Sequence, residues 1–192
     1  MELISHFIDG KLYSDNNSRK GKVFNPATGE QIADVELASK DIVKMAVENS
    51  LQAFAKWSKT TPITRARIFS KYKDLLVQNM NELAELVSKQ HGKTIPDAKG
   101  SIQRGIEVVE YVTGITSSLK GEHSSNVGTN VDSHTLRQPL GVCAGITPFN
   151  FPAMVPMWMF PVAIACGNTF VLKPSEKDPS CPLKLAELAI EA

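Results

Sequence analysis

The sequence has almost no excess of charge of either sign. It holds 21 lysine and arginine residues against 20 aspartate and glutamate residues in a chain of 192. Proteins that bind nucleic acid or anionic membranes through charge carry a basic excess or a basic patch. The composition therefore predicts neither kind of partner. With 42% hydrophobic residues, the chain is long enough to bury a core as one domain or two small ones.

Cysteine is scarce, and its spacing gives no sign of a metal site. The three cysteines, Cys143, Cys166 and Cys181, form no CxxC pair and no Cys/His cluster at zinc spacing. All three lie in or beside apolar segments, so we expect no metal and a reducing, cytoplasmic compartment. The sequence also lacks GxGxxG, so a nucleotide would have to bind without that glycine-rich loop.

The sequence offers little that resembles a membrane segment or a secretory signal. The candidate span, residues 151–166, has sixteen residues, whereas a spanning helix needs about 20. Three prolines interrupt it, at Pro152, Pro156 and Pro161, so a buried helix is the better interpretation. The N-terminus carries Glu2 and turns polar within ten residues, which is unlike a secretory signal.

The first 120 residues divide into strands followed by helices. Up to about Leu37, short apolar runs alternate with turn signals, including Asp9-Gly10, a dipeptide typical of a tight hairpin. Gly100 and Gly105 each cost about 1 kcal/mol inside a helix, so we expect them to permit close packing. Apolar residues at helical spacing predict four helices, at 40–59, 62–79, 80–92 and 96–120.

The rest of the chain alternates strands and helices. The polar segment 121–138 predicts a protruding hairpin. An apolar strand follows at 140–147, expected to be buried on both faces, and then a helix at 151–167. A second strand at 168–173 leads into a helix capped by Ser180. This order predicts a βαβα unit with a parallel sheet, and so an α/β protein.

The end of the chain suggests that more sequence belongs to the fold. Two parallel strands are fewer than the five or six of a typical doubly wound sheet. The last residue, Ala192, lies within an amphipathic helix that has no C-terminal cap signal. We therefore expect an incomplete doubly wound sheet and the first part of a longer protein.

Polar residues follow the carboxyl ends of both predicted strands. Asn150 comes just after the first strand, and Lys173 to Glu176 come at the end of the second. Ligands of parallel α/β sheets collect beyond the carboxyl ends of the strands. We expect these polar groups to face one crevice.

These segments resemble one family. The stretch from Gly141 to Glu176 is similar to the aldehyde dehydrogenase superfamily, in its turn "PFNFP" and its strand ending "KPSE". Five further matches, "FNPATGE", "HGKTIPDAKG", "IQRGIEVVEY", "LRQPLGV" and "PMWMFPVAIACGNT", resemble its coenzyme A-acylating branch. The resemblance runs from about His6 to Ala192. It implies strands and helices that pack on the cofactor domain (1–120), an oligomerisation hairpin (121–138) and the start of an NAD-binding domain (139–192).

The resemblance assigns a catalytic role to Asn150 and a substrate-binding role to Arg104. It implies that the Asn150 amide donates to the oxyanion formed when a thiolate attacks an aldehyde. The alternative is an Asx-turn residue that caps the following helix. Arg104 matches an arginine that grips the carboxylate of a semialdehyde acid, with Gly105 leaving room for substrate. The alternative is an exposed helix arginine paired with Glu107.

The resemblance places NAD at the second strand end. Lys173 and Glu176 resemble the residues that hold the adenosine ribose, and a carboxylate there would repel a 2′-phosphate, which favours NAD over NADP. Thr147 and Phe149 would line the same cofactor, and Lys177 would reach its adenosine side. The alternative for Lys173 to Lys177 is a solvated turn between a strand and a helix.

The implied activity is oxidation of malonate or methylmalonate semialdehyde by NAD, with coenzyme A as acyl acceptor, giving acetyl- or propionyl-CoA. The family's nucleophilic cysteine matches none of the three cysteines, so we expect the 192 residues to be inactive alone. The resemblance also implies a homotetramer for the longer protein. The alternative is a non-enzymatic nucleotide-binding or assembly piece that pairs with intact subunits.

Overall fold

The N-terminal part of the chain forms two small sheets. The computed structural model describes residues 2–15 and 18–192. The first sheet has the order β1-β5-β4, with β1 parallel and β4 antiparallel to β5. β2 and β3 form a separate hairpin, in which Asp9 and Gly10 both take the left-handed conformation, at φ 55° and 69°. The hairpin predicted at this dipeptide is therefore confirmed. The strands are β1 (Glu2–Ile4), β2 (His6–Ile8), β3 (Lys11–Tyr13), β4 (Arg19–Phe24) and β5 (Gln31–Leu37).

Five helices follow, and the first three match the predicted segments closely. The predicted helix 96–120 is wrong in its length, because it is broken at Gly114. Ser39, Thr61 and Thr94 cap α1, α2 and α4 by accepting a backbone N–H bond at the start of each helix. The helices are α1 (Lys40–Trp57), α2 (Pro62–Gln78), α3 (Met80–His91), α4 (Ile95–Thr113) and α5 (Ile115–Ser118).

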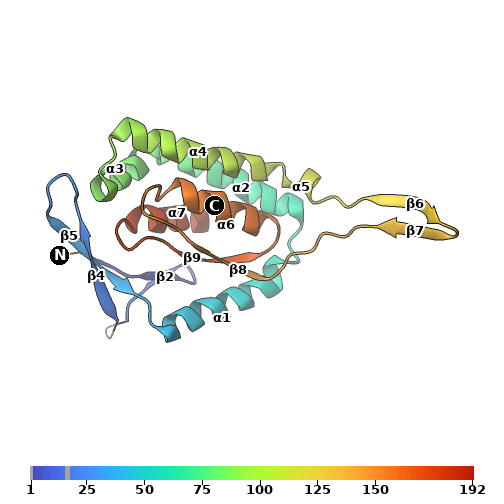
Figure 1. Cartoon of the computed structure of the whole chain (residues 1–192), viewed down its shortest axis with the longest axis horizontal. Helices are drawn as coiled ribbons and strands as arrows, with labels where there is room; N and C mark the ends of the chain where they lie inside the picture. The colour runs from blue at the N-terminus through green and yellow to red at the C-terminus, as the bar shows by residue number, and fades with distance from the viewer. Residues whose placement is uncertain (1, 16–17) are drawn as a thin grey trace.

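The predicted βαβα unit is present at the end of the chain. It consists of β8 (Val142–Ile146), α6 (Met154–Ala165), β9 (Thr169–Lys173) and α7 (Ser180–Glu191). β8 and β9 pair in parallel with Ile146 opposite Lys173. In Figure 1 the two strands lie between α1 on one side and α6 on the other, and both helices contact them. This arrangement is that of an α/β protein.

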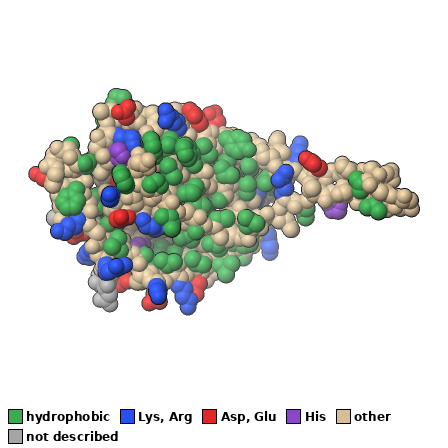
Figure 2. All heavy atoms as spheres, viewed as in Figure 1, with side chains coloured by type: hydrophobic (Ala, Val, Ile, Leu, Met, Phe, Trp, Pro, Cys, Tyr) green, Lys and Arg blue, Asp and Glu red, His purple; other side chains and the backbone are tan. Residues whose placement is uncertain are grey.

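The strand β8 is not buried on both faces as predicted. Ala144 is exposed, and the side chain of Ile146 is 78% exposed. Within the part of the chain that the structure describes, β9 is the only strand paired with β8, so the other edge of β8 is open. Figure 2, drawn in the same view as Figure 1, shows hydrophobic side chains gathered on the surface of the molecule away from the β6–β7 hairpin.

The main core lies between the helices and the βαβα unit. It joins side chains from α2, α3 and α4 to others from α6 and α7. Among its fully buried members are Tyr72, Leu76, Ile102, Met157 and Leu185. The Tyr72 hydroxyl donates to the Leu185 carbonyl at 3.0 Å, so this buried polar group is satisfied. The described residues contain no helix long and apolar enough to cross a membrane.

The two glycines of α4 have different surroundings. A Cβ on Gly105 would overlap the end of the Met157 side chain, and would lie 3.1 Å from the Met157 Cβ. Gly105 therefore permits α4 and α6 to pack closely, and the space beside it holds Met157 in place of the substrate expected there. A Cβ on Gly100 would meet nothing within 4 Å. The prediction of close packing is confirmed at Gly105 and wrong at Gly100.

The hairpin predicted at 121–138 is confirmed. It consists of β6 (His123–Gly128) and β7 (Val131–His134), and every residue of both strands is exposed. Asn130 takes the left-handed conformation, at φ 60°, in the turn between them. Figure 1 shows the hairpin extending well away from the body.

The two glycines of α4 give a matched test of the packing. Gly100→Ala should raise the free energy of unfolding by about 0.5–1 kcal/mol, because alanine is the better helix former and has room. Gly105→Ala should lower it by roughly 1 kcal/mol, because displacing Met157 outweighs the same helix gain. Urea unfolding of both variants checks this, and two changes of the same sign would contradict the packing of α4 on α6.

Candidate functional site

The site begins where β8 and β9 end side by side. The backbone N–H of Thr147 donates to the Lys173 carbonyl at 3.1 Å, which extends the parallel ladder by one residue. The loops that leave the two strands therefore start next to each other. The strand ends that precede Asn150 and Glu176 are thus side by side, and the expectation that these polar groups face one crevice stays a prediction.

The two loops also touch through an aromatic ring. The Lys177 ammonium lies 4.4 Å from the centroid of the Phe149 ring, within the range of a cation–π contact. The ring of His91, at the end of α3, lies 6.4 Å from the same ring. Thr147 is buried, and its hydroxyl oxygen has no hydrogen-bond partner among the described residues. A buried hydroxyl without a partner costs free energy.

Lys173 and Glu176 form an exposed pair on the second loop. The Lys173 ammonium and a Glu176 carboxylate oxygen lie 3.2 Å apart, and both side chains are more than half exposed. Hydrogen bonding to its own backbone N–H, and then to Lys173, lowers the pKa of Glu176, so the carboxylate is ionised near neutral pH. A surface pair of this kind contributes about 0–1 kcal/mol, so both groups can turn to a ligand at little cost.

Asn150 lies on the first loop with its side chain free. Its residue is exposed, and its amide makes no hydrogen bond to any residue that the structure describes. The helix α6 begins only at Met154, with Ala153 as its N-cap and no side-chain cap. Asn150 therefore does not cap this helix, and the alternative that made it a capping residue is wrong.

Arg104 lies on α4 and is exposed. It forms no ion pair with Glu107 or with any other acid in the described ranges, 2–15 and 18–192. No contact joins it to the other predicted site residues. The helix that carries Arg104, α4, packs on α6. The helix α6 begins shortly after Asn150, at Met154. The guanidinium is thus free to bind an anion at the surface of α4.

Two charged residues beside the loops were not predicted. Lys93, between α3 and α4, donates from its ammonium to the Asn150 carbonyl and lies 4.3 Å from the centroid of the Phe151 ring. Asp178, just before α7, is only 2% exposed, and neither carboxylate oxygen has a well-aligned hydrogen-bond partner. Burial raises the pKa of Asp178 to about 7, although the nearby Ser175 hydroxyl and the Lys93 cation act against the shift.

None of the three thiols is prepared for nucleophilic attack. Cys181 lies in the first turn of α7, where a helix N-terminus can lower the pKa of a thiol, but its thiol is fully buried, and burial raises its pKa. Burial also raises the pKa of Cys166, although the neighbouring Arg65 acts against the shift. Cys143 is half-buried in β8. Cys166, at the end of α6, is likewise half-buried.

The start of α7 also differs from the prediction. Ser180 does not cap it, because Pro179 is the N-cap residue. Gln90 of α3 supplies the missing partner, since its carbonyl oxygen accepts from the Ser180 N–H at 3.0 Å. Its amide nitrogen donates to the Ser180 hydroxyl at 2.7 Å. The turn that carries Asp178 is therefore fixed to α3.

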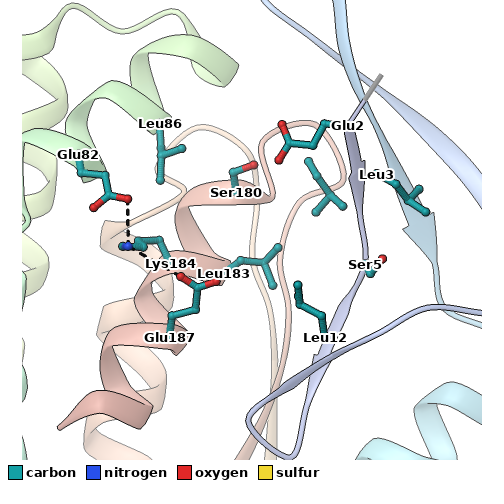
Figure 3. A pocket seen from close by; sticks show the side chains of 11 residues that line it. Glu2, Leu3, Ser5, Leu12, Glu82, Leu86, Ser180, Leu183, Lys184 and Glu187 are labelled. Atoms are coloured by element: carbon teal, nitrogen blue, oxygen red, sulfur yellow. Dashed lines mark ion pairs between the residues drawn. The ribbon is translucent and has the colours of Figure 1, made fainter.

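A separate cavity of about 240 Å³ lies between β1, α3 and α7. Figure 3 shows leucine side chains on its walls and Lys184 paired with Glu82 and Glu187, at 3.0 and 3.9 Å. None of the predicted site residues lines it. Glu2, Glu82 and Glu187 line it together with a single cation, Lys184, so its charged groups carry a net negative charge.

Known proteins resemble this chain over its whole length. A family model described as the aldehyde dehydrogenase family matches residues 13–192. A malonate-semialdehyde dehydrogenase of Pseudomonas aeruginosa is 52% identical over all of the chain, which covers 38% of that protein. A protein assigned as a mitochondrial methylmalonate-semialdehyde/malonate-semialdehyde dehydrogenase of Dictyostelium discoideum is 50% identical. The match covers 97% of the chain and 35% of the Dictyostelium protein.

A solved structure agrees with these relatives. A protein assigned as a methylmalonate-semialdehyde dehydrogenase of Sinorhizobium meliloti 1021, solved with NAD, is 55% identical with a TM-score of 0.97. The match covers all of the chain and 39% of that structure. The predicted α/β fold of an aldehyde dehydrogenase is thereby confirmed. The chain spans about two fifths of the length of the relatives it matches.

The buried carboxyl of Asp178 predicts a pH-dependent stability. Its pKa is about 7 in the folded chain against 3.8 ordinarily, so the folded state binds more protons between these values. Stability therefore falls as the pH rises from about 4 to about 7. Asp178→Asn should remove this loss. It should raise the free energy of unfolding by roughly 1–3 kcal/mol at pH 8 and change it much less at pH 4.

Thermal unfolding at both pH values checks this expectation. Asp74→Asn is the matched control, because Asp74 is exposed on α2 and should give no pH-dependent difference. An Asp178→Asn variant that loses stability equally at both pH values would contradict a neutralised, buried carboxyl.

Proposed function

The chain belongs to the aldehyde dehydrogenase family, and on that premise we propose that it supplies the NAD-binding and oxyanion-binding residues of a coenzyme A-acylating semialdehyde dehydrogenase. The reaction converts malonate or methylmalonate semialdehyde, NAD and coenzyme A to acetyl- or propionyl-CoA, carbon dioxide and NADH. The observation that carries this proposal is the pairing of β8 with β9, which brings Thr147 and Lys173 to one edge, where the loop that contains Asn150 begins.

The residues at the strand ends fit NAD. The exposed and loosely paired Lys173 and Glu176 offer a donor and an acceptor for a ligand with hydroxyl groups, and Thr147 would line the same site. Lys173 and Glu176 would hold the two ribose hydroxyls, and the ionised Glu176 would repel a 2′-phosphate. Phe149 and Lys177 would line the adenosine side. NAD, when bound, accepts the hydride from the oxidised carbon.

Asn150 has the chemistry of an oxyanion donor. Its amide is neutral, exposed and free of other hydrogen bonds in the described part of the chain, so it loses no existing bond when it donates. A donor that is already oriented stabilises the negative charge that develops on the aldehyde oxygen. We assign Asn150 the role of hydrogen-bond donor to the oxyanion. We assign the role of attacking thiolate to none of the three cysteines.

Arg104 selects the substrate class in this proposal. An unpaired guanidinium can bind a carboxylate through two parallel charge-assisted hydrogen bonds. A semialdehyde that carries a carboxylate would therefore bind better than a simple aliphatic aldehyde. The relatives named as malonate- and methylmalonate-semialdehyde dehydrogenases support this choice.

The hairpin of β6 and β7 supports a role in assembly. Both strands are fully exposed and extend away from the body, which leaves their outer edges open for pairing with another subunit. We propose a homo-oligomer, a homotetramer by family, in a reducing cytoplasmic compartment that suits three free cysteines. The same hairpin favours the second candidate function, a non-enzymatic piece that joins intact subunits.

The oxyanion role can be tested in a chimera. Residues 1–192 would replace the matching part of the Pseudomonas aeruginosa relative, to which the chain aligns over its full length. Asn150→Ala in this chimera should lower kcat on malonate semialdehyde by about 10²–10³, as for loss of one oxyanion donor. The affinity for NAD should stay nearly unchanged, because the ribose-binding residues are intact.

Gln103→Ala is the matched control, since Gln103 is an exposed amide on α4 and should leave kcat unchanged. Steady-state kinetics and an NAD titration of each chimera give the comparison. Full turnover by the Asn150→Ala chimera would remove Asn150 from the catalytic step. An inactive parent chimera would favour the assembly role.

A further inference from the structure

The protruding hairpin carries two of the four histidines of the chain. His123 lies in β6 and His134 lies in β7, and the register of the two strands places them directly opposite each other. Both side chains are exposed. The spacing of the cysteines predicts no metal, and the histidines match no metal-binding spacing along the sequence. The pair becomes visible only in the register of the hairpin.

The hydrogen bonds of the hairpin show that the two histidines occupy a close pair. The Thr135 N–H donates to the Glu122 carbonyl at 2.9 Å, and the Glu122 N–H donates to the Thr135 hydroxyl at 2.8 Å. Hydrogen-bonded and non-hydrogen-bonded pairs alternate along an antiparallel ladder. His123 and His134 are the next pair, so theirs is a non-hydrogen-bonded position. Opposite Cα atoms at such positions are typically about 4.5 Å apart, and their side chains leave the same face.

The two imidazole rings have few competing contacts. Nε2 of His123 lies 3.2 Å from the hydroxyl of Ser125, two residues further along the same face of β6. No ion pair joins either histidine to an acid in the part of the chain that the structure describes. Asp132 lies on the same face of β7 as His134, but its carboxylate already accepts from the Asn126 N–H at 2.9 Å. Both rings are therefore available to a ligand from solvent.

Two neutral imidazoles on one face suit a divalent transition-metal ion. Imidazole nitrogen binds Zn²⁺, Ni²⁺ and Cu²⁺ well, whereas Mg²⁺ and Ca²⁺ prefer oxygen ligands. Solvent surrounds both rings, so each can turn about its own side-chain bonds toward a shared ion. Within residues 2–15 and 18–192, no three histidine, cysteine or carboxylate side chains gather as metal ligands. The hairpin therefore supplies two ligands, and water supplies the others.

We propose that His123 and His134 form a two-histidine binding site for one divalent transition-metal ion, such as Zn²⁺, on the hairpin. The ion joins β6 to β7, and its remaining coordination positions face solvent. Because the hairpin is the proposed assembly element, these open positions lie where another subunit would approach. The site needs only the register of the hairpin, so it does not depend on the proposed roles of Asn150 or of NAD.

The test is a titration of the isotope-labelled 192-residue chain with Zn²⁺ at about pH 7.5, because a metal-binding imidazole must be neutral. The NMR signals of the His123 and His134 rings should shift along one saturation curve, and calorimetry should give one ion per chain. The rings of His6 and His91 should not follow that curve. Mg²⁺ should shift neither ring of the pair, because it prefers oxygen ligands.

The matched control keeps both imidazoles and changes only their faces. In the double variant His134→Ser/Ser133→His, the two imidazoles leave opposite faces of the ribbon, because successive side chains of a strand alternate. The affinity for Zn²⁺ should fall by about tenfold or more in this variant and in His123→Asn, because the second imidazole no longer binds at a high effective concentration. His123→Asn decides the question if the double variant disturbs the hairpin.

Two outcomes would overturn the proposal. The first is an affinity for Zn²⁺ in His123→Asn or in the double variant that equals that of the native chain, because a second imidazole on the same face would then contribute nothing. The second is half an ion per native chain, because two chains would then share the ion and one hairpin would not hold it alone. Neither readout involves turnover, so the result is independent of the kinetics of the chimeras.

Discussion

Parallel pairing of β8 with β9 is the constraint on which the candidate site depends. Parallel strands end at the same edge of a sheet, so the pairing alone places the loop of Asn150 beside the turn of Lys173. The crossover helix α6 holds this pairing, and its close contact with α4 is possible because residue 105 is a glycine. The packing of α4 and α6 on the two strands therefore brings distant segments together. The residues of the loops at the strand ends supply the chemistry of the site.

The sizes of their contributions to stability show which charged residues shape the site. The exposed Lys173–Glu176 pair contributes about 1 kcal/mol at most, so it does not hold the turn in place. Gln90 holds the start of α7 through two hydrogen bonds, and that fixes the turn before it. Asp178 is the opposite case, because a buried carboxyl costs stability when it ionises. A chain that retains such a group carries this cost in the turn between β9 and α7.

Local features of the fold were predictable from the sequence, and the contacts around the site were not. Asp9-Gly10 needs only its own backbone conformation to make a turn, and the alternation of strands and helices needs only hydrophobic spacing. Asn150 and Lys173 were identified because Asn150 follows one strand and Lys173 ends the next. Lys93 and Asp178 follow no such pattern. Lys93 is 57 residues from Asn150 in the sequence, so their contact exists only after the helices pack. Burial likewise raises the pKa of the Cys181 thiol, which its place at the start of a helix would not predict.

The most direct measurement of the central claim is an NMR titration of the labelled 192-residue chain with NAD and, separately, with NADP. The account predicts weak binding of NAD, with shifts concentrated at 147–150 and 173–177, where the two strands end. NADP should give smaller shifts at equal concentration, because the Glu176 carboxylate repels a 2′-phosphate. Shifts centred elsewhere, or equal responses to the two nucleotides, would contradict the assignment of this edge of the sheet as the NAD site.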